Sequence, residues 1–263
     1  MSPAPTLRSW LIEEPFSLGL SAGFFGFFAH AGLVQALEAE GLWPARAAGS
    51  SAGALVAGLW ASGRDAAAIG QILREVRRED FWDPAPGPGL LRGLRLRGLL
   101  ERHLAARTFA DCRFALCVSA CDLLRLRTHV LDRGLLVPAV HASCAFPLLF
   151  QPVWLDGRPH ADGGILDRHG LAGMPAAGRL LYHHLGSRSP WRLPGSRALQ
   201  APTRRATVTL VIDGLPRLGP FRLEPGPAAL ERARDATRRA LCAPLRLDAD
   251  DVARLSVRGT MVA

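Results

Sequence analysis

A strand, a glycine-bearing turn and a helix occur twice near the start of this chain, and this repeat limits its fold more than any other feature. Residues 16–20 predict a short buried strand, and the loop 21–26 leads into a helix expected over 27–41. A short strand or loop at 44–49 then leads through two adjacent serines into a helix at 52–63, which is apolar nearly all round. This alternation is typical of a layered α/β fold.

The rest of the chain continues the alternation without an internal repeat. Further strands are predicted at 114–123, 179–184 and 207–212, and further helices at 65–80, at the end of 90–104 and at 228–241. Asp156 and Gly157 predict the turn of a hairpin, and residues 186–205 predict a mobile loop. We find no second-domain boundary, so one domain over 1–263 is expected.

The two adjacent serines lie in a G-x-S-x-G pattern whose register selects Ser51 and not Ser50. A tight strand-to-helix turn strains the backbone of the serine, and Gly49 and Gly53 remove the Cβ clashes that would block it. The N–H of Ala52 at the positive end of the following helix would stabilise a developing oxyanion. The pattern therefore predicts either a nucleophile elbow around Ser51 or a serine that only caps the helix.

A nucleophilic serine needs a base, and the usual partner is a histidine held by a carboxylate. None of the eight histidines lies in a recognisable motif, so surface or core positions are expected for most of them. Three Asp-Gly pairs offer a carboxylate instead. Asp156 and Asp213 have the sequence context of turns, whereas Asp162 precedes two glycines and so allows a close approach of the backbone to another segment.

In this order, these motifs resemble those of the patatin-like phospholipases. Ser51 in GSSAG falls on the nucleophile of that family and Asp162 in ADGG on its base, and residues 142–147 match an AS-x-A-x-P element. The resemblance covers residues 16–185. It implies a three-layer α/β/α fold with a mixed, mainly parallel central sheet, and a Ser–Asp dyad that uses no histidine.

The oxyanion loop departs from the family pattern G-G-G-x-[RK]-G. Here it is SAGFFG over 21–26, with Ala22 in place of one glycine and no arginine, closer to the G-F-L-G form of the animal adipose triglyceride lipase branch. The resemblance implies an oxyanion hole of backbone N–H groups from Ala22, Gly23 and Phe24 together with Ala52. The phenylalanines at 24, 25, 27 and 28 are expected either in the core or along an acyl-chain channel.

The resemblance implies a lipid acyl hydrolase of the phospholipase A or lipase type that works through an acyl-Ser51 intermediate, with no metal and no organic cofactor. Since an ordinary aspartate has a pKa of about 3.9, burial of Asp162 is expected to raise the pKa to a useful value. Two alternatives stay open. One is a catalytically impaired lipid-binding protein, and the other is an acyltransferase or thioesterase that uses the same dyad.

The formal net charge is +9, and every basic residue is an arginine. Arginine binds phosphate, but no nucleic-acid motif accompanies the charge and the chain has a single tyrosine, so nucleic acid is not expected as a partner. Leucines alternate with Arg92, Arg95, Arg97 and Arg102. This segment, with the 186–205 loop, has two interpretations: the buried leucine face of an ordinary helix with solvated arginines, or peripheral contact with an anionic membrane.

The five cysteines are odd in number and have no zinc-site spacing, so reduced, buried thiols are expected. No basic segment followed by a long apolar stretch begins the chain, so no signal peptide is evident. A cytoplasmic protein, with possible docking on a membrane surface, is the expectation from these features.

Overall fold

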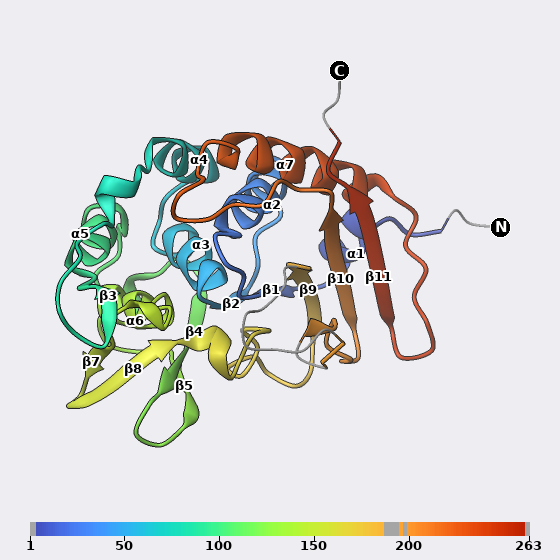
Figure 1. Ribbon diagram of the computed structural model, residues 1–263. Helices are drawn as coiled ribbons and strands as arrows, with labels where there is room; N and C mark the ends of the chain where they lie inside the picture. The colour runs from blue at the N-terminus through green and yellow to red at the C-terminus, as the bar shows by residue number, and fades with distance from the viewer. Residues whose placement is uncertain (1–3, 187–194, 197–198, 261–263) are drawn as a thin grey trace.

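The computed structural model describes residues 4–186, 195–196 and 199–260, and its centre is a nine-stranded sheet (Figure 1). The strand order is β11-β10-β9-β1-β2-β4-β8-β7, with β5 paired to β4. The six strands from β11 to β4 run parallel, whereas β5, β7 and β8 are antiparallel to their neighbours. The predicted α/β fold with a mixed, mainly parallel central sheet flanked by helices is confirmed.

The strands of this sheet are β1 (Phe16–Leu20), β2 (Arg46–Ser50), β4 (Ala115–Asp122), β5 (Arg127–Leu131), β7 (Val153–Leu155), β8 (Arg158–Asp162), β9 (Arg179–His184), β10 (Thr207–Asp213) and β11 (Val252–Arg258). A separate two-stranded sheet pairs β3 (Gly89–Leu91) with β6 (Leu148–Phe150). The helices are α1 (Leu7–Glu13), α2 (Phe27–Ala39), α3 (Ala52–Ala61), α4 (Ala66–Glu75), α5 (Leu94–His103), α6 (Leu136–Ser143) and α7 (Gly226–Cys242). None of the described helices is long and apolar enough to span a membrane.

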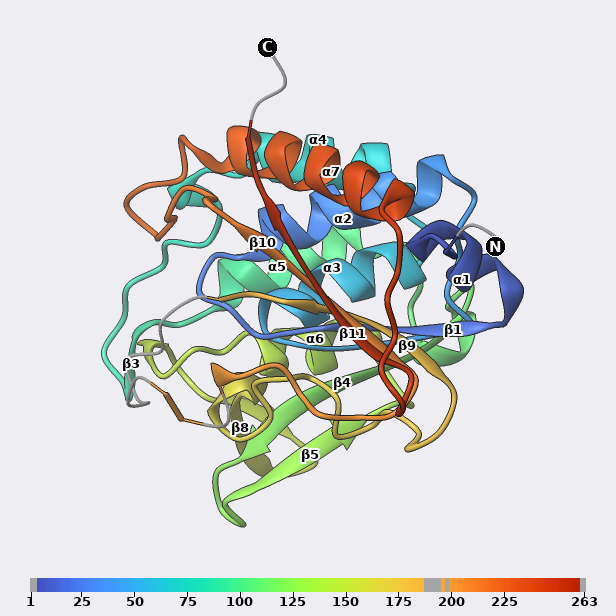
Figure 2. The same cartoon turned by 90° about the vertical axis from the view of Figure 1, so that its right-hand side faces the viewer.

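The predicted repeat of strand, turn and helix is present as β1, α2, β2 and α3. Helices α2, α3 and α7 lie over the same face of the sheet (Figure 2). Two glycines allow this close packing. A Cβ at Gly32 would lie 2.3 Å from the carbonyl oxygen of Leu230 in α7, and a Cβ at Gly53 would lie 2.1 Å from that of Leu20 in β1. The small residues of α2 and α3 therefore bring these helices into the core.

Several boundaries and elements differ from the sequence-based prediction. The helix expected over 65–80 ends at Glu75, because Val76 leaves the helical conformation and the Arg77 side chain donates to the free carbonyls of Arg74 and Glu75. A 3₁₀ turn, η1 (Arg78–Asp80), follows. The elements α1, α6, β11 and the β3–β6 pair are additions. The predicted hairpin is confirmed as β7 and β8, with Asp156 and Gly157 both at positive φ in its turn.

All five cysteines are free, as expected, but not all are buried. Cys117 and Cys121 are buried in β4, whereas Cys242 is exposed because it ends the amphipathic helix α7 on the solvent side. Residues 187–194 and 197–198 of the predicted loop lie outside the described part of the chain.

Candidate active site

Ser51 stands between the end of β2 and the start of α3, in a backbone conformation that few side chains adopt. Its φ is +54° and its ψ is −117°. A Cβ at Gly49 would lie 2.5 Å from the carbonyl carbon of Gly53, so the turn requires glycine there. The N–H of Ser51 donates to Oγ of Ser143 at 3.0 Å, which fixes the strained residue from the side of α6. The neighbouring Ser50 is fully buried.

Sheet register brings Asp162 to Ser51. Ser50, the last residue of β2, pairs with Ser119 of β4, and Asp162, the last residue of β8, pairs with the next residue of β4, Ala120, so β2 and β8 both end beside the same point of β4. The hydroxyl of Ser51 donates to Oδ2 of Asp162 at 2.6 Å. The N–H of Gly164 donates to the other carboxylate oxygen at 2.8 Å. Serine and carboxylate are therefore in direct contact.

The double glycine after Asp162 has a steric cause at each position. A Cβ at Gly163 would lie 2.0 Å from the carbonyl oxygen of Ser119, and a Cβ at Gly164 would lie 2.7 Å from the Cβ of Ala22. Gly163 therefore lets the chain pass directly over β4. Gly164 lets it pass beside the glycine-bearing loop 21–26.

Burial changes the acidity of Asp162. Desolvation raises the pKa of this carboxyl from 3.8 to about 6, although the hydrogen bonds from Ser51 and Gly164 and the charge of Arg168 oppose the rise. A carboxylate with this pKa accepts a proton near neutral pH far more readily than an exposed aspartate does. The carboxyl thus has the proton affinity of a general base.

The histidines lie elsewhere. His30 and His183 form a buried pair with 2.8 Å between their Nδ1 atoms, and His129 bonds His160 at 2.8 Å. Surface or core positions were expected for most histidines; five of the eight are buried, and the other three are partly exposed. Within the described residues, neither Ser51 nor Asp162 hydrogen-bonds a histidine. No cluster of three or more metal-ligating side chains forms in that same part of the chain.

The loop 21–26 passes beside Asp162 and lines the same cavity as Ser51. The N–H of Ala22 donates to the carbonyl oxygen of Arg168 at 2.7 Å, so this group is not free to bind a substrate oxygen. The N–H groups of Gly23 and Phe24 have no acceptor among the described residues, and neither has the N–H of Ala52 at the start of α3. Of the four predicted donors, the structure thus leaves three without a partner.

An apolar cavity of about 110 Å³ begins at Ser51 and runs under α4 and α5. Leu55 and Leu59 line it one and two turns along α3, opposite Leu96, Leu149 and Phe150. The phenylalanines divide between the two predicted places. Those at 24, 25 and 27 line the cavity, whereas Phe28 is buried in the core.

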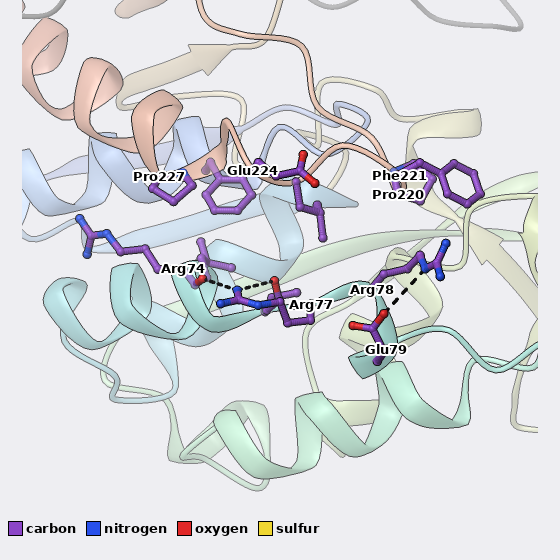
Figure 3. A pocket seen from close by; sticks show the side chains of 12 residues that line it. Arg74, Arg77, Arg78, Glu79, Pro220, Phe221, Glu224 and Pro227 are labelled. Carbon is purple, nitrogen blue, oxygen red and sulfur yellow. Dashed lines mark hydrogen bonds and ion pairs between the residues drawn. The ribbon is translucent and has the colours of Figure 1, made fainter.

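A second, wider groove of about 810 Å³ lies between α4 and the segment before α7 (Figure 3). It shares Leu73 and Val76 with the apolar cavity but does not reach Ser51. The arginines that line this groove interact with other groups of the protein. Arg77 donates to carbonyls at the end of α4, and Arg78 stacks on the rings of Trp82 and Phe221. These contacts stabilise the wall of the groove, and they do not indicate which ligand, if any, the groove would bind.

Sequence reasoning missed two residues that support the site. Ser143 accepts from the N–H of Ser51, and its only signal was its place in the AS-x-A-x-P element. Arg168 is buried, and its carbonyl oxygen accepts the hydrogen bond from the N–H of Ala22. The charge of its guanidinium lowers the pKa of Asp162. No motif marked Arg168, because its role depends on contacts between distant segments.

Comparison with known proteins assigns the family. The model of the patatin-like phospholipases matches residues 18–174. This chain belongs to the patatin-like phospholipase family. Uncharacterized NTE family proteins of Mycobacterium tuberculosis and Mycobacterium bovis are 34% identical to this patatin-like protein over 181 residues, which make up 67% of this chain and 50% of theirs. The chain therefore spans about half the length of these relatives.

One solved structure supports the fold. VipD from Legionella pneumophila superposes with a TM-score of 0.50 at 16% identity, over 88% of this chain and 67% of that one. The type III effector ExoU of Pseudomonas aeruginosa gives a TM-score of 0.47 at 19% identity, over 87% of this chain and 53% of that one. At this identity the likeness to VipD concerns the fold alone.

Proposed function

We propose that this patatin-like protein is a lipid acyl hydrolase with Ser51 as nucleophile and Asp162 as its base. One observation carries the proposal: the 2.6 Å hydrogen bond from the Ser51 hydroxyl to the Asp162 carboxylate, on a strained turn that opens into an apolar cavity. Family membership supports lipid hydrolysis in general. The roles of these two residues are our inference from the geometry.

In the first half-reaction, Oγ of Ser51 attacks the ester carbonyl carbon while its proton passes to Asp162. The carbonyl oxygen becomes an oxyanion and accepts hydrogen bonds from the free N–H groups of Gly23, Phe24 and Ala52. The intermediate collapses, the bond from carbon to the leaving oxygen breaks, and Asp162 returns the proton to the departing alcohol. An acyl-Ser51 ester remains.

In the second half-reaction, water replaces the alcohol. Asp162 takes a proton from the water as its oxygen attacks the acyl carbon, and the same N–H groups bind the second oxyanion. Collapse breaks the bond to Oγ, Ser51 recovers the proton, and the carboxylic acid leaves. An alcohol in place of water would make the same residues an acyltransferase, so the acceptor decides between the two reactions.

The cavity favours an unbranched acyl chain. Ser51, Leu55 and Leu59 follow one face of α3 at intervals of four residues, so the cavity extends roughly 12 Å from the nucleophile at a rise of 1.5 Å per residue. Apart from Gly23, Ala52 and Cys144, its other walls are leucine, isoleucine, valine and phenylalanine side chains. An extended apolar chain would bury its surface along this path, whereas a charged acyl group would lose its hydration.

A lipid-panel assay tests the proposal. Wild type, Ser51→Ala and Asp162→Asn are incubated with phospholipids, acylglycerols and acyl-thioesters, with and without an alcohol acceptor, and free acids and transfer products are measured. We expect hydrolysis by wild type and a loss of at least about a thousandfold in both variants. Ser50→Ala is the matched control and should keep its activity. Turnover that persists in folded Ser51→Ala protein would overturn the assignment.

A further inference from the structure

Three leucines beside the cavity are exposed to solvent, although leucine is normally buried. Leu90 in β3, Leu94 at the start of α5 and Leu148 in β6 are 49%, 54% and 75% exposed. Gly89 pairs with Leu148 across the two-stranded sheet, so the tips of β3 and β6 lie side by side. Figure 1 shows β3 and α5 together at one end of the molecule. Leu90 and Leu148 therefore lie on paired strands, and Leu94 begins the helix that follows β3, so all three belong to one region of the surface.

Leu148 is also held in a conformation that is costly for a bulky residue. Its φ is +66°, in the left-handed region that leucine rarely enters. The residues around it behave differently: Phe146, Leu149 and Phe150 line the cavity, and the ring of Phe146 lies 5.0 Å from that of Phe24. The strained turn thus directs one leucine outward while its neighbours form the cavity wall. The exposed Leu148 is therefore next in sequence to Leu149, which lines the same cavity as Ser51.

Arginines predominate in the segment that carries Leu90 and Leu94, although the carboxylate of Asp83 accepts from the N–H groups of Gly93 and Arg95. The segment 89–103 carries four arginines against one glutamate. Arg92 is exposed and has no acidic partner among the described residues, and Arg97, exposed on α5 one turn after Leu94, pairs only with Glu101. Leu96 lies between them in sequence but lines the cavity. Exposed leucines with arginines beside them match the interface of an anionic bilayer, where apolar chains lie below a layer of phosphates.

We propose that Leu90, Leu94 and Leu148, with Arg92 and Arg97, form a leucine–arginine patch that docks the protein on an anionic lipid bilayer. The leucines enter the acyl region and the arginines bind the phosphate layer. Docking in this orientation brings the β6 side of the cavity to the membrane, so that an acyl chain can pass to Ser51 without crossing water. This last consequence rests on the proposed hydrolase function, whereas docking itself does not.

The β4–β5 turn supplies a matched control. Leu124 and Leu126 are 66% and 75% exposed, and Arg125 and Arg127 lie next to them. This turn has the same chemistry, but none of its residues lines the cavity. A protein that binds lipid through any exposed leucine would lose as much affinity from substitution here as from substitution in the patch.

The test is flotation of the full chain with vesicles of phosphatidylcholine alone or mixed equally with phosphatidylglycerol. All variants carry Ser51→Ala, so that hydrolysis does not alter the vesicles. We expect binding to the mixed vesicles to weaken about 25-fold in Arg92→Gln/Arg97→Gln, at about fivefold per arginine. A loss of about tenfold per leucine is expected in Leu90→Ser/Leu148→Ser. Binding should also fall as salt rises from about 0.1 M to about 1 M and screens the charges.

Three outcomes would overturn the proposal: equal binding to neutral vesicles, binding that is indifferent to salt, or an equal loss in Leu124→Ser/Leu126→Ser. Hydrolysis of a soluble short-chain ester is measured separately with Ser51 restored. Patch variants should keep that activity, because no patch residue lines the cavity. If wild type hydrolysed nothing, the hydrolase proposal would fail while the docking result stood by itself.

Discussion

Burial of an ionisable carboxyl at the dyad predicts that Asp162 lowers the stability of the protein at neutral pH. The pKa of Asp162 is about 6 in the folded protein, against 3.8 for an exposed aspartate. Because the folded state holds the proton more tightly than the unfolded state, stability from this group is fully present below pH 3.8. It is lost as the pH rises through about 6. Replacement by the neutral isostere, Asp162→Asn, removes this dependence.

The magnitude follows from the two pKa values. A difference of about 2 pKa units corresponds to about 3 kcal/mol in the free energy of unfolding over the whole titration. Between about pH 5 and about pH 8 the wild type should lose about 1.4 kcal/mol relative to Asp162→Asn. For a chain of this length that change shifts the difference between the two melting temperatures by about 3 °C.

Thermal or urea unfolding of both proteins at the two pH values measures this quantity. Near pH 5 the difference in the free energy of unfolding between the two proteins reports the exchange of a largely protonated carboxyl for an amide. The change in that difference toward pH 8 reports the ionisation of Asp162, since all other titrating groups are common to both proteins. A difference that does not vary with pH would refute the reasoning. So would a wild type that gains on the variant as the pH rises, because a carboxyl whose pKa is raised by burial can only lose stability over this range.

Four further results are expected. A fluorophosphonate probe should label wild type and Ser50→Ala but not Ser51→Ala, because only Ser51 contacts Asp162; mass spectrometry of the labelled peptide checks this. The kcat/KM for an uncharged ester should rise with pH through about 6, as the Asp162 carboxylate forms, and then level off; a second limb from a histidine would contradict the dyad. Gly23→Val should lower kcat at least about a hundredfold if its N–H binds the oxyanion, whereas a change confined to KM would place the loop in substrate recognition. Leu55→Phe should block the cavity one turn from Ser51, so activity on long-chain p-nitrophenyl esters should fall at least about tenfold more than activity on p-nitrophenyl acetate. Leu55→Ala should instead shift the preference toward the long-chain esters.

Local sequence was sufficient for the elements that are buried on all sides. The strand at 16–20 and the helices after the two glycine turns were predicted to within two residues at their ends, because hydrophobic runs and glycine breaks mark them directly. Elements that depend on distant partners were not predictable. Residues 255–258 of β11 alternate apolar and polar, but most of the strand is exposed or partly exposed, and its pairing with β10 at the edge of the sheet cannot be read from the sequence. Helix α4 stops early because of a cap from Arg77, which hydrophobic periodicity cannot report.

At the site, motifs identified the residues but not their surroundings. Ser51 and Asp162 were candidates from G-x-S-x-G and from the double glycine, and their separation by 111 positions gave no distance between them. The register of β2, β4 and β8 supplies that distance. For the leucine- and arginine-rich segment, the sequence allowed a buried leucine face or a membrane contact. The structure divides its leucines between the two: Leu99 and Leu100 are buried, whereas Leu90 and Leu94 are exposed.

The alanine that replaces a glycine in the oxyanion loop has a structural explanation. Ala22 is not among the residues with positive φ, so its backbone conformation does not require glycine. Its N–H is bound to the carbonyl oxygen of Arg168, and its Cβ occupies the space that a side chain at position 164 would need. Gly164 therefore provides both an N–H for the Asp162 carboxylate and room for Ala22. The loop and the aspartate segment fit each other as a pair, and the proposed oxyanion donors lie one and two residues further on, at Gly23 and Phe24. Loss of that glycine thus leaves the proposed oxyanion hole intact, because the hole depends on backbone N–H groups that position 22 does not supply.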